Sequence, residues 1–137
     1  MEQLKRKYEY LCNYPCDINE HLPTLYNYAR ECESILELGV RGVVSSYAFV
    51  YGLMNNNKET KNILLNDINE CDISELLFIT KELPINVNYK WVNDLELDIT
   101  DNVDLTFIDT KIDFFKQEEF VIDDTLNGYY YSNENEI

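Results

Sequence analysis

The chain of 137 residues has the length of one ordinary domain, and 45% of its residues are hydrophobic, which is enough to form a sizeable core. Eleven basic residues against 26 acidic ones give a formal net charge of −15, which repels a phosphate backbone and an anionic membrane surface. We therefore expect no direct nucleic-acid binding. The chain has no run of 18 apolar residues and no signal-peptide pattern, so we predict a cytoplasmic protein without a membrane partner.

The cysteine and histidine content argues against a metal site. His21 is the only histidine, and no two cysteines have the CxxC spacing of a zinc site; the four are Cys12, Cys16, Cys32 and Cys71. We therefore predict free thiols and no bound metal.

Two helices are predicted at the N-terminus, over residues 2–12 and 18–29. The first ends before Pro15, because the residue preceding a proline is pushed out of the helical region. Asp17 lies three residues before Glu20, which is the spacing of a capping box and indicates the start of the second helix. Pro23 then falls near the first turn, where a proline costs least.

Strands and helices alternate from residue 34 onward. The predicted strands cover residues 34–38, 62–67, 85–92 and 103–110, and the predicted helices cover 43–54 and 72–83. This alternation predicts an α/β fold, namely a Rossmann-like, doubly wound and mostly parallel sheet of four to five strands with helices on both faces.

Beyond residue 110 the pattern weakens. Residues 111–120 could form a helix and 120–125 a fifth strand, followed by a turn and a polar tail. We therefore expect a single domain over residues 1–137, with N-terminal helices in 1–30, the Rossmann-like core in 34–125 and the polar tail in 126–137.

The segment after the first predicted strand has the composition of a ligand-binding loop. In such sheets ligands bind beyond the carboxyl ends of the strands. Gly39 would let a ligand approach the backbone, Glu37 would offer an acceptor, and Ser45 would add a hydroxyl at a helix N-terminus. Gly42 would ease the turn into the helix. The plainer alternative is a tight strand-to-helix turn capped by serines.

Acidic residues also follow the other predicted strands. Asp67 ends the second strand, 28 positions after Gly39, where a carboxylate can accept hydrogen bonds from ribose hydroxyls. Asp94 follows the third strand and could bind the amino group of an adenine, although an Asx turn is the simpler interpretation. Asp109 ends the fourth strand, where the chemistry would occur.

Taken together, these segments resemble a known family. The stretches "DINEHL", "ELGVRGVVSS", "LLNDI", "VNDLELD" and "FIDT" are similar to those of class I S-adenosylmethionine-dependent methyltransferases, in particular to a group with an E-x-G-V-R-x-x-x-S-[ST] first motif. The resemblance spans residues 17–110. It implies S-adenosylmethionine as cofactor, with Glu37, Gly39 and Ser45 around its methionine part, Asp67 at the ribose and Asp94 beside the adenine. Asp109 would lie on the acceptor side, where some relatives bind a metal ion.

The sequence departs from the family pattern at three points. Arg41 and Val43 stand where the commoner pattern has glycines, and "FIDT" is followed by Lys111 instead of an aromatic residue and a histidine. We also expect the sheet to lack the last strands of a full methyltransferase. Two functions therefore stay open. One is methyl transfer to an unidentified acceptor with Asp109 as the catalytic residue. The other is a catalytically inactive methyltransferase-like domain that acts as a binding or structural subunit, with a homodimer or partner chain covering an open sheet edge.

Overall fold

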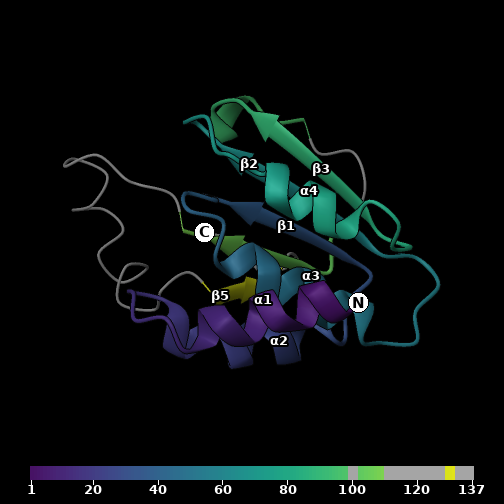
Figure 1. The fold of residues 1–137 in the computed structure, drawn as a ribbon. Coiled ribbons are helices and arrows are strands. Elements are labelled where there is room, and N and C mark those ends of the chain that lie inside the picture. The colour runs from purple at the N-terminus through teal and green to yellow at the C-terminus, as the bar shows by residue number, and fades with distance from the viewer. Residues whose placement is uncertain (99–101, 110–128, 132–137) are drawn as a thin grey trace.

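The computed structural model describes residues 1–98, 102–109 and 129–131, the last three by their backbone alone. Figure 1 shows how the helices and strands follow one another; in the order given next, η stands for a short 3-10 helix. The elements are α1 (Glu2–Cys12), η1 (Asn19–His21), α2 (Leu22–Ala29), β1 (Ser34–Leu38), α3 (Ser45–Met54), β2 (Asn62–Asp67), α4 (Ser74–Thr80), β3 (Asn86–Trp91), η2 (Asp94–Glu96), β4 (Leu105–Ile108) and β5 (Tyr129–Tyr131).

The described strands form one sheet in the order β3-β2-β1-β4-β5. β1 pairs in parallel with β2 and with β4, and β2 pairs in parallel with β3. β5 runs antiparallel beside β4. The predicted α/β fold with a mostly parallel sheet is therefore confirmed, and β1 to β4 each begin and end within two residues of their predicted ranges.

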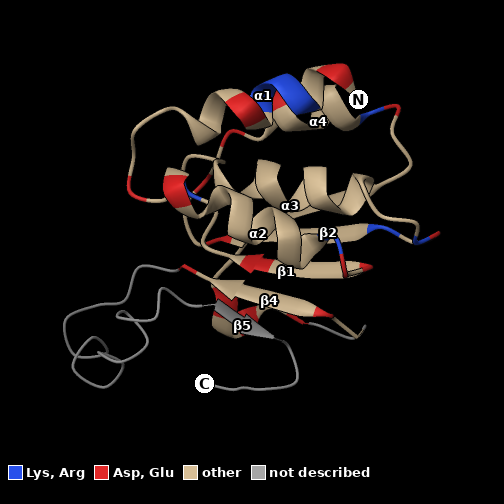
Figure 2. Ribbon diagram, turned by 90° about the horizontal axis from the view of Figure 1, so that it is seen from below, with Lys and Arg blue, Asp and Glu red and all other residues tan. Residues whose placement is uncertain are grey.

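The four described α-helices lie on one face of the sheet (Figure 2). The crossovers through α3 and α4 lead in the same direction across the sheet, and right-handed connections then place both helices on the same side. α1 lies over α3 on the side away from the sheet, and α2 packs beside α3 (Figure 2). The sequence predicted helices on both faces, and the one further predicted helix, over residues 111–120, lies outside the described residues.

α3 is the central helix, because it contacts the sheet and both N-terminal helices, α1 and α2. Eight of its ten residues are buried, including both serines of its first turn. Phe49 packs edge-on against Phe107 of β4, with ring centroids 5.3 Å apart. This burial on all sides explains why the α3 sequence has almost no polar face.

Gly52 allows α3 to approach α2 closely. A Cβ atom at this position would lie 2.5 Å from the Ala29 Cβ and 2.5 Å from the Tyr26 carbonyl oxygen. We expect Gly52→Ala to lower the free energy of unfolding by about 1–3 kcal/mol, because the helices must move apart. Gly42→Ala is the control, since a Cβ there meets nothing within 4 Å. Equal midpoints of the two variants in urea denaturation would contradict the close packing.

The segment before α2 differs from its prediction. Instead of a helix that begins at residue 18, the chain forms η1, and α2 begins at Leu22 with Pro23 in its first turn. No side chain caps either element. Asp17, the predicted cap, instead forms an ion pair with Arg41 across the fold. The capping-box prediction was therefore wrong, because a partner distant in sequence takes the carboxylate.

The C-terminal part contains a strand that the sequence analysis assigned to the polar tail. Tyr129–Tyr131 forms β5 and pairs with Leu105 to Phe107 of β4. The fifth strand predicted over residues 120–125 lies outside the described residues. Among the residues that are described, no helix is long and apolar enough to cross a bilayer, and all four cysteines carry free thiols.

Candidate functional site

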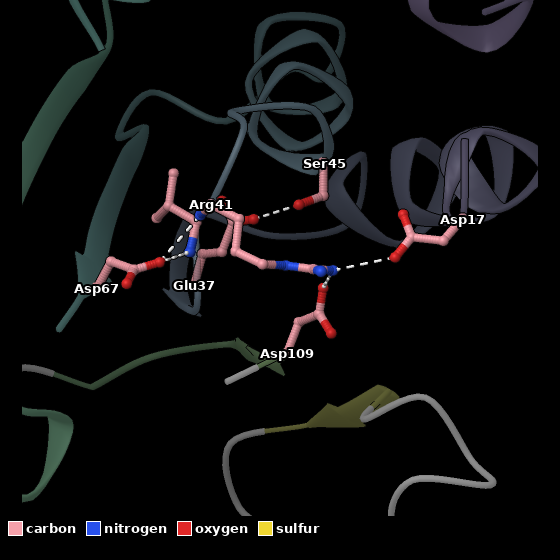
Figure 3. Close-up of polar contacts among 7 residues, drawn as sticks. Asp17, Glu37, Arg41, Ser45, Asp67 and Asp109 are labelled. Carbon is pink, nitrogen blue, oxygen red and sulfur yellow. Dashed lines mark hydrogen bonds and ion pairs between the residues drawn. The ribbon is translucent and has the colours of Figure 1, made fainter. Parts of the chain in front are cut away.

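The candidate site lies at the carboxyl ends of β1, β2 and β4. On one side of β1 lie β2 and then β3, and on its other side lies β4. The order of the strands therefore reverses at β1. This reversal marks the position where ligands bind in open α/β sheets. Figure 3 shows that Glu37, Asp67 and Asp109, which belong to or follow these three strands, surround the loop after β1.

The loop after β1 has an unusual backbone. Gly39 has a φ of 94°, and the non-glycine residues Arg41 and Val43 have φ values of 49° and 60°. Such angles are uncommon for any side chain and strained for a β-branched residue. The loop therefore has a left-handed conformation at Gly39, Arg41 and Val43. Gly42, which the sequence analysis assigned to the turn, has no such angle.

Asp67 fixes this loop to the end of β2. Its Oδ2 accepts hydrogen bonds from the backbone N–H groups of Val40 at 2.8 Å and Arg41 at 2.9 Å, and its Oδ1 accepts one from Asn69 at 2.8 Å. Burial would raise the pKa of this carboxyl, but hydrogen bonds from the backbone of Asn69, Arg41 and Val40 and from the Cys71 thiol hold it below its usual value. Each oxygen can accept about two hydrogen bonds, so Oδ2 is saturated by Val40 and Arg41.

Glu37 is enclosed at the N-terminus of α3. The residue has no exposed surface, and its carboxylate accepts hydrogen bonds from the hydroxyls of Ser45 and Ser46. Burial raises the Glu37 pKa to about 7, against the opposing effect of the two hydroxyls. The hydroxyl of Ser45 is thus directed at Glu37, and the predicted roles of both residues toward a cofactor stay predictions.

Arg41 joins three parts of the chain that lie far apart in sequence. Its Nη2 forms ion pairs with Asp109 Oδ2 at 2.6 Å and with Asp17 Oδ2 at 3.3 Å (Figure 3). Burial raises the pKa of Asp109, and the neighbouring guanidinium counteracts this effect. The guanidinium therefore lies at the mouth of the predicted crevice, between the end of β4 and the segment before η1.

Asp94 lies toward the edge of the same end of the sheet. Asn66 Nδ2 donates to the carbonyl oxygens of Lys90 and Val92, both at 3.0 Å, and so fastens the chain that leads into η2. Asn93 forms an Asx-type turn, because its Oδ1 accepts from the Leu95 N–H at 2.9 Å. The half-buried Asp94 carboxylate makes no hydrogen bond to a described residue.

Three large apolar side chains are exposed near Asp94, namely those of Ile68, Trp91 and Leu95. Trp91 Nε1 donates to the Ile68 carbonyl oxygen at 3.0 Å, so the ends of β2 and β3 carry adjoining apolar groups. Exposed apolar groups beside unpaired polar ones are typical of a site for a flat, mostly apolar ligand group.

The structure thus brings together Glu37, Gly39, Ser45, Asp67 and Asp109 around one loop, with Asp94 farther out along the same edge. Sequence reasoning missed Arg41 and Asp17 as site residues, although Arg41 was already conspicuous as a departure from the glycine pattern. The described residues contain no group of three or more histidine, cysteine or carboxylate side chains that could hold a metal ion.

A separate polar hollow lies at the opposite end of the molecule from the candidate site, where α2 and α3 end. None of the predicted site residues contributes to it; its lining residues are Asn27, Arg30, Glu31, Asn55, Asn56 and Asn57. Its amides are partly engaged within the chain, as Asn56 Nδ2 donates to the Cys32 carbonyl oxygen at 2.9 Å. We therefore place the candidate site at the strand ends and not in this hollow.

Comparisons with family models, with curated proteins and with solved structures gave no match to this chain.

Proposed function

We propose that this protein binds S-adenosylmethionine and transfers its methyl group to an acceptor. The observation that carries the proposal is the loop from Gly39 to Val43, which keeps a left-handed backbone and is fastened by Asp67 where the strand order reverses. A doubly wound, methyltransferase-like core would present this loop to the cofactor. The resemblance of the first motif to methyltransferases supports the same assignment.

The charges around the loop favour a cationic ligand over a phosphate. Glu37 lies at the N-terminus of α3, the position at which dinucleotide-binding folds hold a pyrophosphate. Asp67 and Asp109 add further carboxylates, with Arg41 as the basic residue among them. A phosphate would be repelled by this group, whereas the positively charged sulfonium of S-adenosylmethionine would be attracted.

The described residues can be assigned to parts of the cofactor. The backbone at Gly39 would contact the methionine part, and Asp67 Oδ1, which accepts from the Asn69 N–H, would accept from a ribose hydroxyl. The Asp94 carboxylate, which has no hydrogen-bond donor among the described residues, would accept from the adenine amino group, and the exposed side chains of Ile68 and Leu95 would contact the ring.

Positioning would supply most of the catalysis. S-adenosylmethionine, when bound, supplies an electrophilic methyl group on sulfur. The chain would orient the acceptor beside it, and Asp109 at the end of β4 would accept the proton of the acceptor. Burial already raises the pKa of Asp109, which makes its carboxylate a better base than an exposed aspartate.

Isothermal titration of the full chain tests the proposal. S-adenosylmethionine and S-adenosylhomocysteine are expected to bind, whereas NAD and ATP are not. Asp94→Ala is expected to weaken binding of either adenosyl ligand roughly threefold to tenfold, because one hydrogen bond to the adenine is lost. Glu96→Ala is the matched control, since it removes an equal charge from the same turn, η2.

If neither adenosyl ligand binds, the methyltransferase proposal fails. If the Asp94 and Glu96 variants weaken binding equally, the assignment of Asp94 to the adenine is wrong and the effect is one of net charge.

One observation favours the alternative of an inactive binding or structural subunit. The polar groups predicted to hold the cofactor are largely engaged within the chain: Asp67 with three N–H groups, Ser45 with Glu37, and Asp109 with Arg41. In addition, among the described strands β3 has a neighbour on one side only, and its other side would pair with a second copy or a partner chain. A monomer in a sizing measurement, together with binding of S-adenosylmethionine, would count against this alternative.

A further inference from the structure

The guanidinium of Arg41 uses only part of its hydrogen-bonding capacity. Both of its ion pairs are made by the single atom Nη2, at 2.6 Å from Asp109 and 3.3 Å from Asp17. Neither Nε nor Nη1 makes a hydrogen bond to a described residue, and the side chain is 51% exposed. A guanidinium carries five N–H donors in a flat fork that fits a carboxylate, so the donors on Nε and Nη1 have no acceptor among the described residues.

The two aspartates hold the guanidinium unequally. Asp109 makes the shorter contact and is 34% exposed, whereas Asp17 makes the longer one and is 70% exposed. Exposed ion pairs are weak and are screened by salt, so the Asp17 contact is easily displaced. Asp109 therefore orients the guanidinium, while Asp17 occupies a position that another carboxylate could take.

A ligand that carries a carboxylate could bind beside the loop after β1 only if a cation such as the Arg41 guanidinium offsets the acidic residues around it. Glu37, Asp67 and Asp109 are arranged around the same loop, and a bare carboxylate placed among them would be repelled. Arg41 follows Gly39 by two residues, so its side chain starts beside the backbone assigned to the amino-acid part of the cofactor.

We infer that Arg41 is the receptor for the α-carboxylate of the ligand's amino-acid part, and that Asp17 stands in for this carboxylate when no ligand is bound. The inference rests on the proposed function. It assigns Arg41 a binding role at a position where the common family pattern has a glycine, and it makes Asp17 a competitor of the ligand.

A pair of ligands that differ only in the amino-acid part tests this role. S-adenosylhomocysteine carries the α-carboxylate, and 5′-methylthioadenosine has the same nucleoside and sulfur without it. In isothermal titration of the full chain, Arg41→Gln is expected to weaken binding of S-adenosylhomocysteine roughly tenfold to a hundredfold, which is the effect of losing a charged hydrogen bond. Its affinity for 5′-methylthioadenosine is expected to change less than about twofold.

Asp17→Asn is the second variant and keeps the test valid if Arg41→Gln does not fold. It is expected to strengthen binding of S-adenosylhomocysteine roughly twofold to fivefold, because a weak competing ion pair is removed, and to leave 5′-methylthioadenosine unchanged. Variants that affect both ligands equally, or neither, would overturn the role of Arg41 while the proposed function stands. If the unmodified chain binds neither ligand, the proposed function itself fails and the inference fails with it.

Discussion

Replacing Asp67 with alanine is expected to lower the free energy of unfolding by about 3–5 kcal/mol. The substitution leaves the N–H groups of Val40, Arg41 and Asn69 without their acceptor, and each unpaired group with restricted access to water costs about 1–3 kcal/mol, reduced where water can enter. Val40 is itself buried, so its N–H group cannot simply turn to solvent. Urea denaturation near neutral pH measures the loss.

Two controls distinguish the loss of hydrogen bonds to the loop from a general effect of removing a charge. Asp67→Asn keeps one oxygen for Val40 and Arg41 and is expected to lose less than half as much stability as the alanine variant. Asp72→Ala removes an exposed carboxylate that accepts only from Ser74, and only a small change is expected. An Asp67→Ala variant as stable as the unmodified chain would show that this carboxylate does not hold the loop.

The lowered pKa of Asp67 also predicts how the stability of the fold changes with pH. A carboxyl whose pKa is lower in the folded than in the unfolded state stabilises the fold above its ordinary value of 3.8, and this contribution is lost as the pH falls through the folded-state pKa. Asp67 therefore contributes to unfolding in acid. Because Asp67→Ala removes a structural support, loss of ligand binding in that variant alone would not identify the ribose site.

Replacing Glu37 with glutamine is expected to stabilise the protein at alkaline pH. The Glu37 pKa rises from 4.5 to about 7 on folding, so the folded state binds a proton that the unfolded state has released. Its contribution is favourable at low pH and is lost as the pH rises through about 7. The difference in unfolding free energy between variant and unmodified chain is expected to grow from under about 1 kcal/mol at pH 5 to about 3 kcal/mol at pH 8.

Glutamine suits the site because its oxygen can accept from one serine while its amide donates to the other. A weaker hydrogen bond of the amide than of the protonated carboxyl to the serines would lower both values equally, by about 1 kcal/mol, so the slope with pH is the informative quantity. Glu33→Gln, an exposed change just before β1, is the control and is expected to have little effect at either pH. A difference that stays constant between pH 5 and pH 8 would exclude Glu37 as the titrating group.

The positions of β1 to β4 could be predicted from the sequence because their signals are local. A short apolar run such as Ser34–Leu38, bounded by polar residues, forms a strand in almost any sheet, and the alternation with helical segments indicates parallel pairing. The site could also be placed roughly, because parallel strands bring their carboxyl ends to one edge. Gly39, Asp67 and Asp109 meet there as a direct consequence of the strand order.

The partners of the charged side chains could not be predicted in this way. Asp17 had the spacing of a helix cap, but Arg41 lies close enough in the fold to take its carboxylate. Glu37 was expected to open into the crevice, yet the first turn of α3 closes over it with two hydroxyls. The partner lies 24 residues away for Asp17 and eight or nine residues away for Glu37, so in neither case does a turn of the local chain supply it.

By itself, the sequence determined the α/β alternation, the ends of the parallel strands and the glycine loop, since each depends on hydrophobic patterning or on backbone freedom within a few residues. Only the tertiary structure decided that the described helices share one face, that Tyr129–Tyr131 joins the sheet, and that Arg41 lies between Asp109 and Asp17. These features depend on contacts between segments tens of residues apart, and local propensity carries no information about which distant group will be the neighbour.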